Sequence, residues 1–286
     1  MLRLANRELT VELLDPADAV EAARQGPRFC WGGYIWQIHD AKFGPLLAGP
    51  EFPKSDPTPF NGQGLPESFR HRQRDTNVPF IWSGQTGLAL GAGKLAADAT
   101  NAVTLTEPCQ WTIKASVDHI VFQTQQSVAG FSYELTRTIE LRGRTVTSTT
   151  RLINAGESRL ALEWFAHPFF ALTAGRAQLI LPPGTSLPDN PGFALAGDGT
   201  LTFKRAFVKS DDSQFSIVAL PTNRALEIGL DHPALARVTF ATSFAPDECP
   251  VWANAHTVSV EPYLHLDLGA GESRDWELRY GFELKR

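Results

Sequence analysis

From residue 80 to the C-terminus, the sequence consists of short runs rich in Val, Ile, Thr, Phe and Trp, separated by turn-forming residues about every ten positions. Residues 131–141 show the pattern most clearly, because apolar and polar side chains alternate there up to a turn at residues 142–144. A period of two places one set of side chains on each face of a strand. The pattern predicts an all-β protein of antiparallel sheets. Strands do not alternate with helices, which excludes a doubly wound sheet.

The length of the chain fits one large domain. It has 286 residues, of which 43% are hydrophobic and 20% charged, and no Ser/Gly/Pro linker or block of charge divides it. Single β-sandwich or barrel domains commonly reach ~250 residues. We therefore predict one domain over residues 1–286.

Residues 44–77 interrupt the β pattern with a high content of Pro and Gly. This composition disfavours a regular strand or helix. Four embedded apolar residues, Phe52, Phe60, Leu65 and Phe69, favour packing over disorder. We predict a long ordered loop or a lid, because loops of this length in compact domains are usually functional or disordered.

Charge and cysteine content narrow the choice of partners. The net charge is −5, with both signs spread along the chain, so we expect a small-molecule ligand and no nucleic-acid or membrane partner. No stretch approaches ~18 consecutive apolar residues, and the N-terminus lacks a signal-peptide pattern, so we expect a cytoplasmic protein. The three cysteines lie far apart, and no His or Cys spacing indicates a metal site. The oligomeric state is not indicated.

Residues 163–170 are the one place where titratable side chains interrupt a strongly β-prone apolar run. Alternation puts Glu163, Phe165, His167 and Phe169 on one face of the predicted strand. A carboxylate and an imidazole among aromatic rings are typical of a sugar-binding cleft. Two interpretations of His167 stay open at this point: a site residue, or a core histidine satisfied by a hydrogen bond.

Residues 258–268 alternate in the same way, with Glu261 in the polar row and Pro262 directly after it. A polar row commonly faces solvent. Proline inside a strand removes a ladder donor and is typical of an edge or of a functional irregularity. An edge strand and an active site are both compatible with this pattern.

Two segments in this order resemble the galactose mutarotase (aldose 1-epimerase) superfamily. His-Pro-Phe-Phe at residues 167–170 resembles the family's His-Pro-Tyr-Phe, and Ser-Val-Glu-Pro-Tyr at residues 259–263 resembles the late strand that carries its glutamate. Similar segments at residues 26–29 and 268–273 extend the resemblance over most of the chain. It implies a β-supersandwich of antiparallel sheets with a cleft on a concave polar face. A jelly roll or another large sandwich is the alternative.

The resemblance also implies chemical roles. His167 corresponds to the general acid and Glu261 to the general base of sugar anomerisation, a reaction that needs no cofactor. Where related proteins carry another histidine near an arginine, this sequence has Glu67, followed by Arg70. We expect the Pro-rich segment to cover the cleft and bring Glu67 or Arg70 to the sugar. The alternative is a structural belt that leaves Glu67 in solvent.

Glu163 and Trp252 complete the predicted substrate-binding residues. Glu163 shares a predicted strand face with His167 and would keep the imidazole protonated, unless it is an exposed strand residue. Trp252 offers an aromatic face to a pyranose, or is a core residue. The basic run at residues 70–74 fits a phosphate as well as a solvated rim.

The sequence thus predicts a mutarotase that interconverts the α and β anomers of a free aldose or sugar phosphate by general acid/base catalysis. A non-catalytic carbohydrate-binding protein of the same fold is the alternative, because a fold does not determine an activity.

Overall fold

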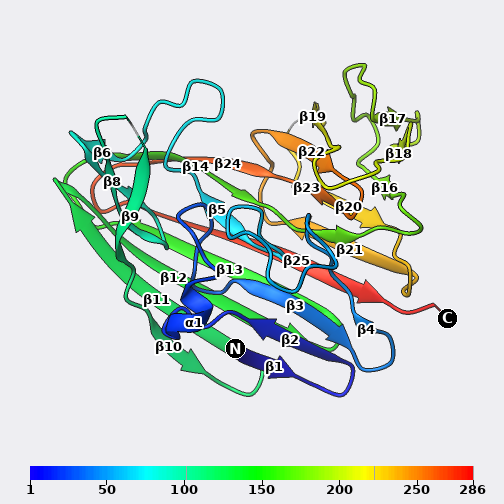
Figure 1. Ribbon diagram of the computed structural model, residues 1–286, viewed down its shortest axis with the longest axis horizontal. Helices are drawn as coiled ribbons and strands as arrows, with labels where there is room; N and C mark the ends of the chain where they lie inside the picture. The colour runs from blue at the N-terminus through cyan, green and yellow to red at the C-terminus, as the bar shows by residue number, and fades with distance from the viewer. Residues whose placement is uncertain (101, 222, 286) are drawn as a thin grey trace.

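The computed structural model describes residues 1–100, 102–221 and 223–285, which form antiparallel β-sheets with very little helix (Figure 1). This confirms the predicted all-β class. The described helix is a single turn, α1 (Ala19–Ala22), and Asp18 caps it by accepting hydrogen bonds from the N–H groups of Val20 and Glu21. No helix in this part of the chain has the length and apolar character needed to cross a membrane.

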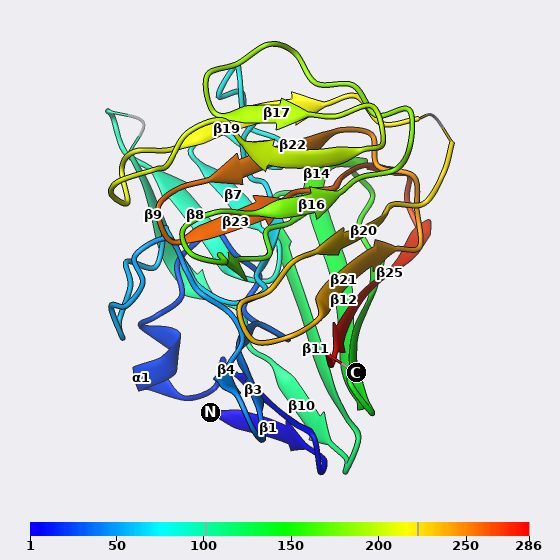
Figure 2. The ribbon, with the colours of Figure 1, turned by 90° about the vertical axis from the view of Figure 1, so that its right-hand side faces the viewer.

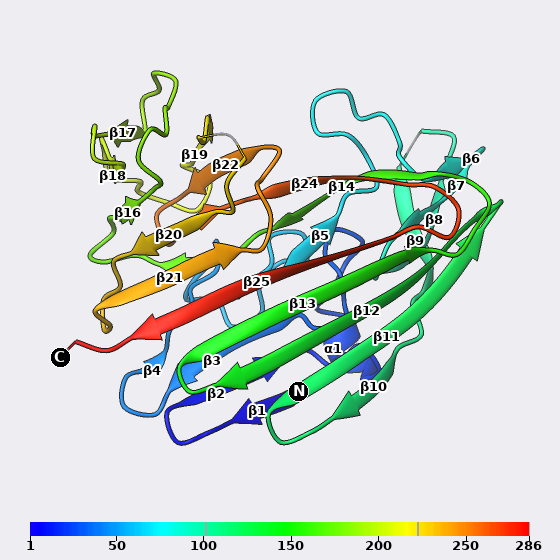
Figure 3. The same cartoon turned by 180° about the vertical axis from the view of Figure 1, so that it is seen from behind.

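The largest sheet has ten strands, and its long members run side by side in Figure 3. In spatial order these are β10 (Thr112–Ala115), β11 (His119–Val128), β12 (Phe131–Arg142), β13 (Thr145–Asn154), β25 (Ser273–Glu283), β21 (Arg237–Thr242), β20 (Glu227–Leu230), β16 (Gln178–Ile180), β18 (Thr200–Phe203) and β17 (Phe193–Leu195).

Four smaller sheets surround it. The first has β1 (Leu2–Ala5), β2 (Leu9–Leu13), β3 (Ile35–Asp40) and β4 (Gly44–Pro45); the second has β24 (Tyr263–Leu268), β14 (Leu160–Ala166) and β5 (Glu67–Phe69). The third has β15 (Phe170–Ala171), β23 (Thr257–Val260), β22 (Cys249–Ala253) and β19 (Gln214–Val218); the fourth has β6 (Trp82–Ser83), β7 (Thr86–Ala89), β8 (Gly93–Ala97) and β9 (Val103–Pro108).

The alternation predicted over residues 131–141 and the turn after it correspond to a hairpin of β12 and β13, which pair from Tyr133 with Asn154 to Arg142 with Thr145. The alternate residues of β12 are buried, as the period of two requires. One member of this buried row is charged: Arg137 is 1% exposed.

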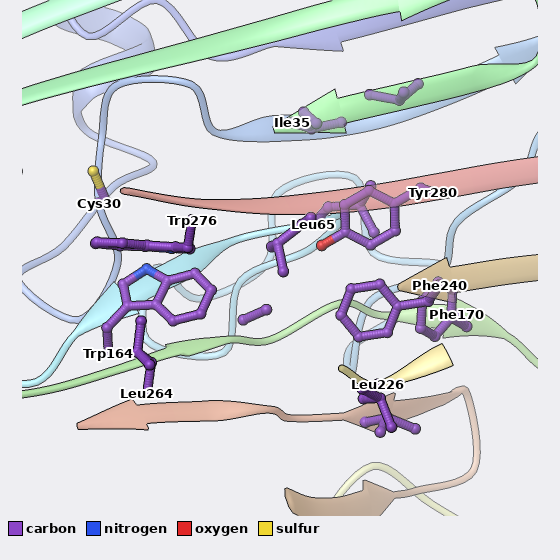
Figure 4. Packing of buried hydrophobic residues seen from close by; sticks show 14 of the residues in the cluster. Cys30, Ile35, Leu65, Trp164, Phe170, Leu226, Phe240, Leu264, Trp276 and Tyr280 are labelled. Atoms are coloured by element: carbon purple, nitrogen blue, oxygen red, sulfur yellow. The ribbon is translucent and has the colours of Figure 1, made fainter. Parts of the chain in front are cut away.

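The core lies between the ten-stranded sheet and the layer that contains β14 and β24. Figure 2, turned by 90° from Figure 1, shows β14 together with β12, β21 and β25 of the large sheet. Figure 4 shows Trp276 of β25 beside Trp164 of β14; the ring centroids are 5.1 Å apart in an edge-to-face arrangement. Further along, Tyr280 of β25 stacks on Phe240 of β21 at 4.9 Å. The apolar face of β14 is therefore committed to the core, and its other face is available for a site.

The Pro-rich segment, residues 44–77, differs from the sequence prediction in one respect. Its first two residues form β4, and it contains the short strand β5, which pairs with β14 through Glu67 opposite Ala166. The rest of the segment consists of turns and irregular backbone, as its composition predicts.

Candidate active site

Strand β14 and the residues directly after it bring three aromatic rings to one pocket. Trp164 and Ala166 are fully buried in the core, whereas Phe165, His167 and Phe169 line a pocket of about 620 Å³ on the opposite side. This is the alternation that the sequence predicts. The strand ends at Ala166, and the N–H of His167 donates instead to the carbonyl of Pro66 at 2.9 Å.

Glu261 enters the same pocket from a break between two sheets. The sequence predicts one continuous strand over residues 258–268, but β23 ends at Val260 and pairs with β22, while β24 begins at Tyr263 and pairs with β14. Pro262 cannot donate a ladder hydrogen bond, which explains the break. The carboxylate of Glu261 therefore projects at the junction of two sheets and is 5% exposed.

His167 and Glu261 form a buried pair. Nε2 of His167 is 3.5 Å from Oε1 of Glu261, and Nδ1 is 2.9 Å from Oγ of Ser259. Burial raises the pKa of Glu261 to about 7, against the lowering effect of Arg28 and Arg70. Burial, with a contribution from Arg28, lowers the pKa of His167 well below its ordinary value. Below about pH 7 the carboxyl group of Glu261 therefore carries a proton, and the lowered pKa of His167 favours the uncharged imidazole.

Glu163 does not keep His167 charged, contrary to the expectation from the sequence. Oε2 of Glu163 is 3.3 Å from Nε of Arg70, and Glu163 is not among the residues that line the pocket. Arg70 does line it, as predicted, and its Nη1 donates to the hydroxyl of Tyr263 at 3.4 Å. Glu163 therefore contacts a residue of the pocket wall, Arg70, without lining the pocket itself.

Trp252 of β22 lines the pocket, as predicted, with its ring centroid 6.3 Å from that of His167. Phe165 and Tyr263 stack at 4.6 Å on the pocket surface. Aromatic faces of this kind pack against the C–H face of a pyranose. The pocket thus places aromatic walls beside the His167–Glu261 pair.

Glu67 is not brought to this pocket. It is 2% exposed, forms a buried ion pair with Arg137 of β12, and accepts a hydrogen bond from Ser148 at 2.7 Å. The position of β5 against β14 turns this side chain toward the ten-stranded sheet. The predicted contact of Glu67 with a sugar therefore has no support in the geometry, and neither does the alternative of Glu67 in solvent.

Arg28 is a pocket residue that the sequence reasoning missed. Its guanidinium carbon is 4.9 Å from the ring centroid of Phe29 and 4.5 Å from that of Phe60, and Nη1 donates to the carbonyl of Phe60 at 2.6 Å. Burial lowers its pKa, against the raising effect of Glu261. The only signal in the sequence is the Gly-Pro-Arg-Phe segment at residues 26–29, which was part of the resemblance but carried no role.

No family model and no curated protein matches the sequence. Solved structures resemble it over nearly its whole length. A galactose mutarotase related enzyme from Lactobacillus acidophilus has a TM-score of 0.62 at 12% identity, covering 100% of this chain and 99% of its own. A galactose mutarotase-like protein from Lactobacillus casei has a TM-score of 0.63 at 15% identity, covering 99% and 100%. A galactose mutarotase-like protein from Clostridium acetobutylicum has a TM-score of 0.59 at 12% identity, covering 99% and 95%.

The chain has the galactose mutarotase-like fold. Within this mutarotase-like fold, the Pro-rich segment contributes to the lining of the pocket with Pro50, Glu51, Lys54, Phe60, Asn61, Arg70 and Arg74. That this segment covers a bound sugar stays a prediction from the sequence.

The residues that line the pocket include the titratable pair His167 and Glu261. Over residues 1–100, 102–221 and 223–285, no three His, Cys, Asp or Glu side chains converge in a way that would hold a metal ion. His167 and Glu261 are groups of the kind that accept and donate protons in acid/base catalysis.

Proposed function

We propose that the protein is a mutarotase that interconverts the α and β anomers of a free aldose or sugar phosphate. The observation that carries this proposal is the buried His167–Glu261 pair, 3.5 Å apart, inside a pocket with aromatic walls. The names of the similar solved structures agree with it, and they contribute the fold alone because their identities are 12–15%.

Anomerisation needs one group that accepts the proton of the anomeric hydroxyl and one that donates a proton to the ring oxygen. With the imidazole neutral and the carboxyl protonated, His167 is the acceptor and Glu261 the donor. This reverses the assignment that the resemblance implies. The C1–O5 bond breaks, the open-chain aldehyde rotates about the C1–C2 bond, and reclosure on the other face returns both protons.

The remaining pocket residues bind and orient the sugar. Trp252 and Phe165 present aromatic faces, and the guanidinium groups of Arg28 and Arg70 offer donors to hydroxyl or phosphate oxygens. Exclusion of water by these walls strengthens the interactions that position the two proton-transfer groups.

We further propose that the chain forms one domain. Its cytoplasmic location stays a prediction from the sequence.

Exchange NMR between the α and β anomers tests the proposal, with a panel of free and phosphorylated aldoses. We expect at least one sugar to interconvert faster with the protein than in buffer. Glu261→Gln keeps the shape of the pocket and removes the donor, so it lowers this acceleration by at least ~100-fold. Glu157→Gln, at an exposed position in the turn before β14, is the matched control and keeps the wild-type rate.

Calorimetric titration of the same sugars distinguishes a mutarotase from a non-catalytic carbohydrate-binding protein. Binding without acceleration of any sugar in the panel would replace the mutarotase by a non-catalytic carbohydrate-binding protein. Retained binding in Glu261→Gln, together with the loss of rate, assigns the residue to chemistry and not to the fold.

A further inference from the structure

A second compartment adjoins the candidate active site. It has a volume of about 580 Å³ and shares four lining residues with the first pocket: Arg28, Phe60, Arg70 and Phe165. Arg28 and Phe60, whose side chains contact each other, therefore lie at the boundary between the two neighbouring spaces.

The acidic and basic side chains that line this compartment are all basic. Arg28, Arg70 and Arg72 line it, and no Asp or Glu does. Arg70 is paired with Glu163. Arg28 and Arg72 instead donate to backbone carbonyls, those of Phe60 and Asn77, and neither is in an ion pair within the described part of the chain. Two guanidinium groups without an acidic partner at one cavity favour an anionic ligand.

The rest of the wall is apolar. Pro27, Pro59, Phe60, Val103 and Phe165 contribute to it, and Phe60 is 65% exposed although its ring lies against Arg28. A free phosphate or a carboxylate alone would leave these surfaces in water. A pyranose ring has an apolar C–H face that matches aromatic and proline surfaces.

We propose that the second compartment binds an acidic sugar residue linked to the aldose that occupies the first pocket. The substrate is then a reducing oligosaccharide whose second residue carries a carboxylate, as a uronic acid does. The inference rests on the proposed function, because it places the reducing end beside His167 and Glu261. The apolar wall holds the ring of the second residue, and Arg72 with Arg28 binds its carboxylate.

Calorimetric binding of two matched disaccharides tests the proposal. Cellobiouronic acid and cellobiose differ only in a carboxylate in place of a hydroxymethyl group on the second ring. We expect the wild-type protein to prefer cellobiouronic acid by about tenfold, since a charge-assisted hydrogen bond contributes about 1.5 kcal/mol or more. Arg72→Gln lowers this ratio toward one. Arg224→Gln, at an exposed arginine that lines a different cavity, keeps the ratio.

His71 supplies a second measurement that does not depend on a variant. It lines the same compartment, and burial together with Arg72 and Arg70 lowers its pKa to about 4. A carboxylate bound there offsets the two positive charges. We therefore expect the pKa of His71, measured by NMR titration, to be higher with bound cellobiouronic acid than with bound cellobiose. Cellobiose has no carboxylate and does not offset the two positive charges.

Several results would overturn the proposal. Equal affinity for the two disaccharides, or a preference that survives Arg72→Gln, removes the carboxylate from this compartment. If glucose 6-phosphate shows the full Arg72-dependent gain over glucose and cellobiouronic acid shows none over cellobiose, the compartment binds an anion of the first ring. Because all these readouts are binding measurements, failure of the mutarotase proposal would appear separately, as the absence of accelerated exchange in NMR.

Discussion

Burial of Glu261 decides how the pair with His167 handles protons. Both side chains are 6% exposed, so the carboxylate loses hydration and the pKa of Glu261 rises to about 7. The same burial lowers the pKa of His167. The state with one proton on the pair, which contains both a donor and an acceptor, is therefore the one present on the acid side of neutrality.

We predict that the rate of anomer exchange falls as the pH rises through about 7, because the pair then loses its proton. The sign follows from the raised pKa of Glu261: the group is protonated below this value and ionised above it. Rates from exchange NMR across this range, corrected for buffer catalysis, measure the effect. A rate that increases through the same range would instead require an ionised Glu261 and would restore it as the base.

At the scale of single residues, the sequence predicted the two titratable members of the pair and two pocket residues, Arg70 and Trp252. The alternation of side chains and the short motifs around His167 and Glu261 are local properties of the chain. They could therefore be recognised in the sequence alone. Arg28 was missed because its role depends on Phe60, which reaches it only through the path of a long irregular segment. Glu67 was misplaced because its partner Arg137 is set by strand packing, which no local pattern encodes.

At the scale of elements, β5 connects the pocket to the ten-stranded sheet. The carbonyl of Glu67 accepts from the N–H of Cys30, the hydroxyl of Ser68 donates to the carbonyl of Arg28, and the buried pair of Glu67 with Arg137 ties the strand to β12. Arg137 also donates to the carbonyl of Gly32 at 2.7 Å. This three-residue strand therefore fixes the backbone on which Arg28 and His167 depend.

We predict that Arg137→Met lowers the free energy of unfolding by about 3–5 kcal/mol, because it leaves the carboxylate of Glu67 buried without its counter-charge. The double variant Glu67→Gln with Arg137→Met recovers part of this loss, since neither charge remains. Urea unfolding of the wild type, both single variants and the double variant measures the coupling. Arg159→Met, at an exposed pair with Asp267, is the control and changes stability little. Strictly additive losses would contradict the prediction.

At the scale of the whole molecule, the pocket collects residues from distant parts of the chain, among them Arg28, Arg70, His167, Trp252 and Glu261. The all-β class could be predicted because alternation repeats along most of the sequence. The way in which β23 and β24 divide between two sheets could not, because it depends on how β14 and β22 are placed in space.

We predict that the raised pKa of Glu261 makes global stability depend on pH. Between 4.5, its ordinary value, and about 7, the folded protein keeps a proton that the unfolded chain releases. Its contribution to the free energy of unfolding therefore falls as the pH rises through this window, by on the order of 3 kcal/mol. His167 contributes with the opposite sign, because its lowered pKa makes stability grow as the pH rises toward 6.5.

Glu261→Gln isolates the carboxyl group, since the variant retains His167. Relative to the wild type, the variant gains stability as the pH rises from 4.5 to about 7, and urea unfolding across this window measures the difference. Parallel stability curves for the two proteins would show that the proton on Glu261 does not distinguish the folded from the unfolded state.

Ser259 and Glu261 hold the two ring nitrogens of His167 from one short stretch of chain, at 2.9 and 3.5 Å. One short stretch of chain therefore sets both the rotation of the imidazole ring and its distance from the carboxyl group. The backbone N–H of His167 donates to the carbonyl of Pro66, so the residue is positioned from two separate segments. A substitution that shifts either segment would change the alignment of the two proton-transfer groups.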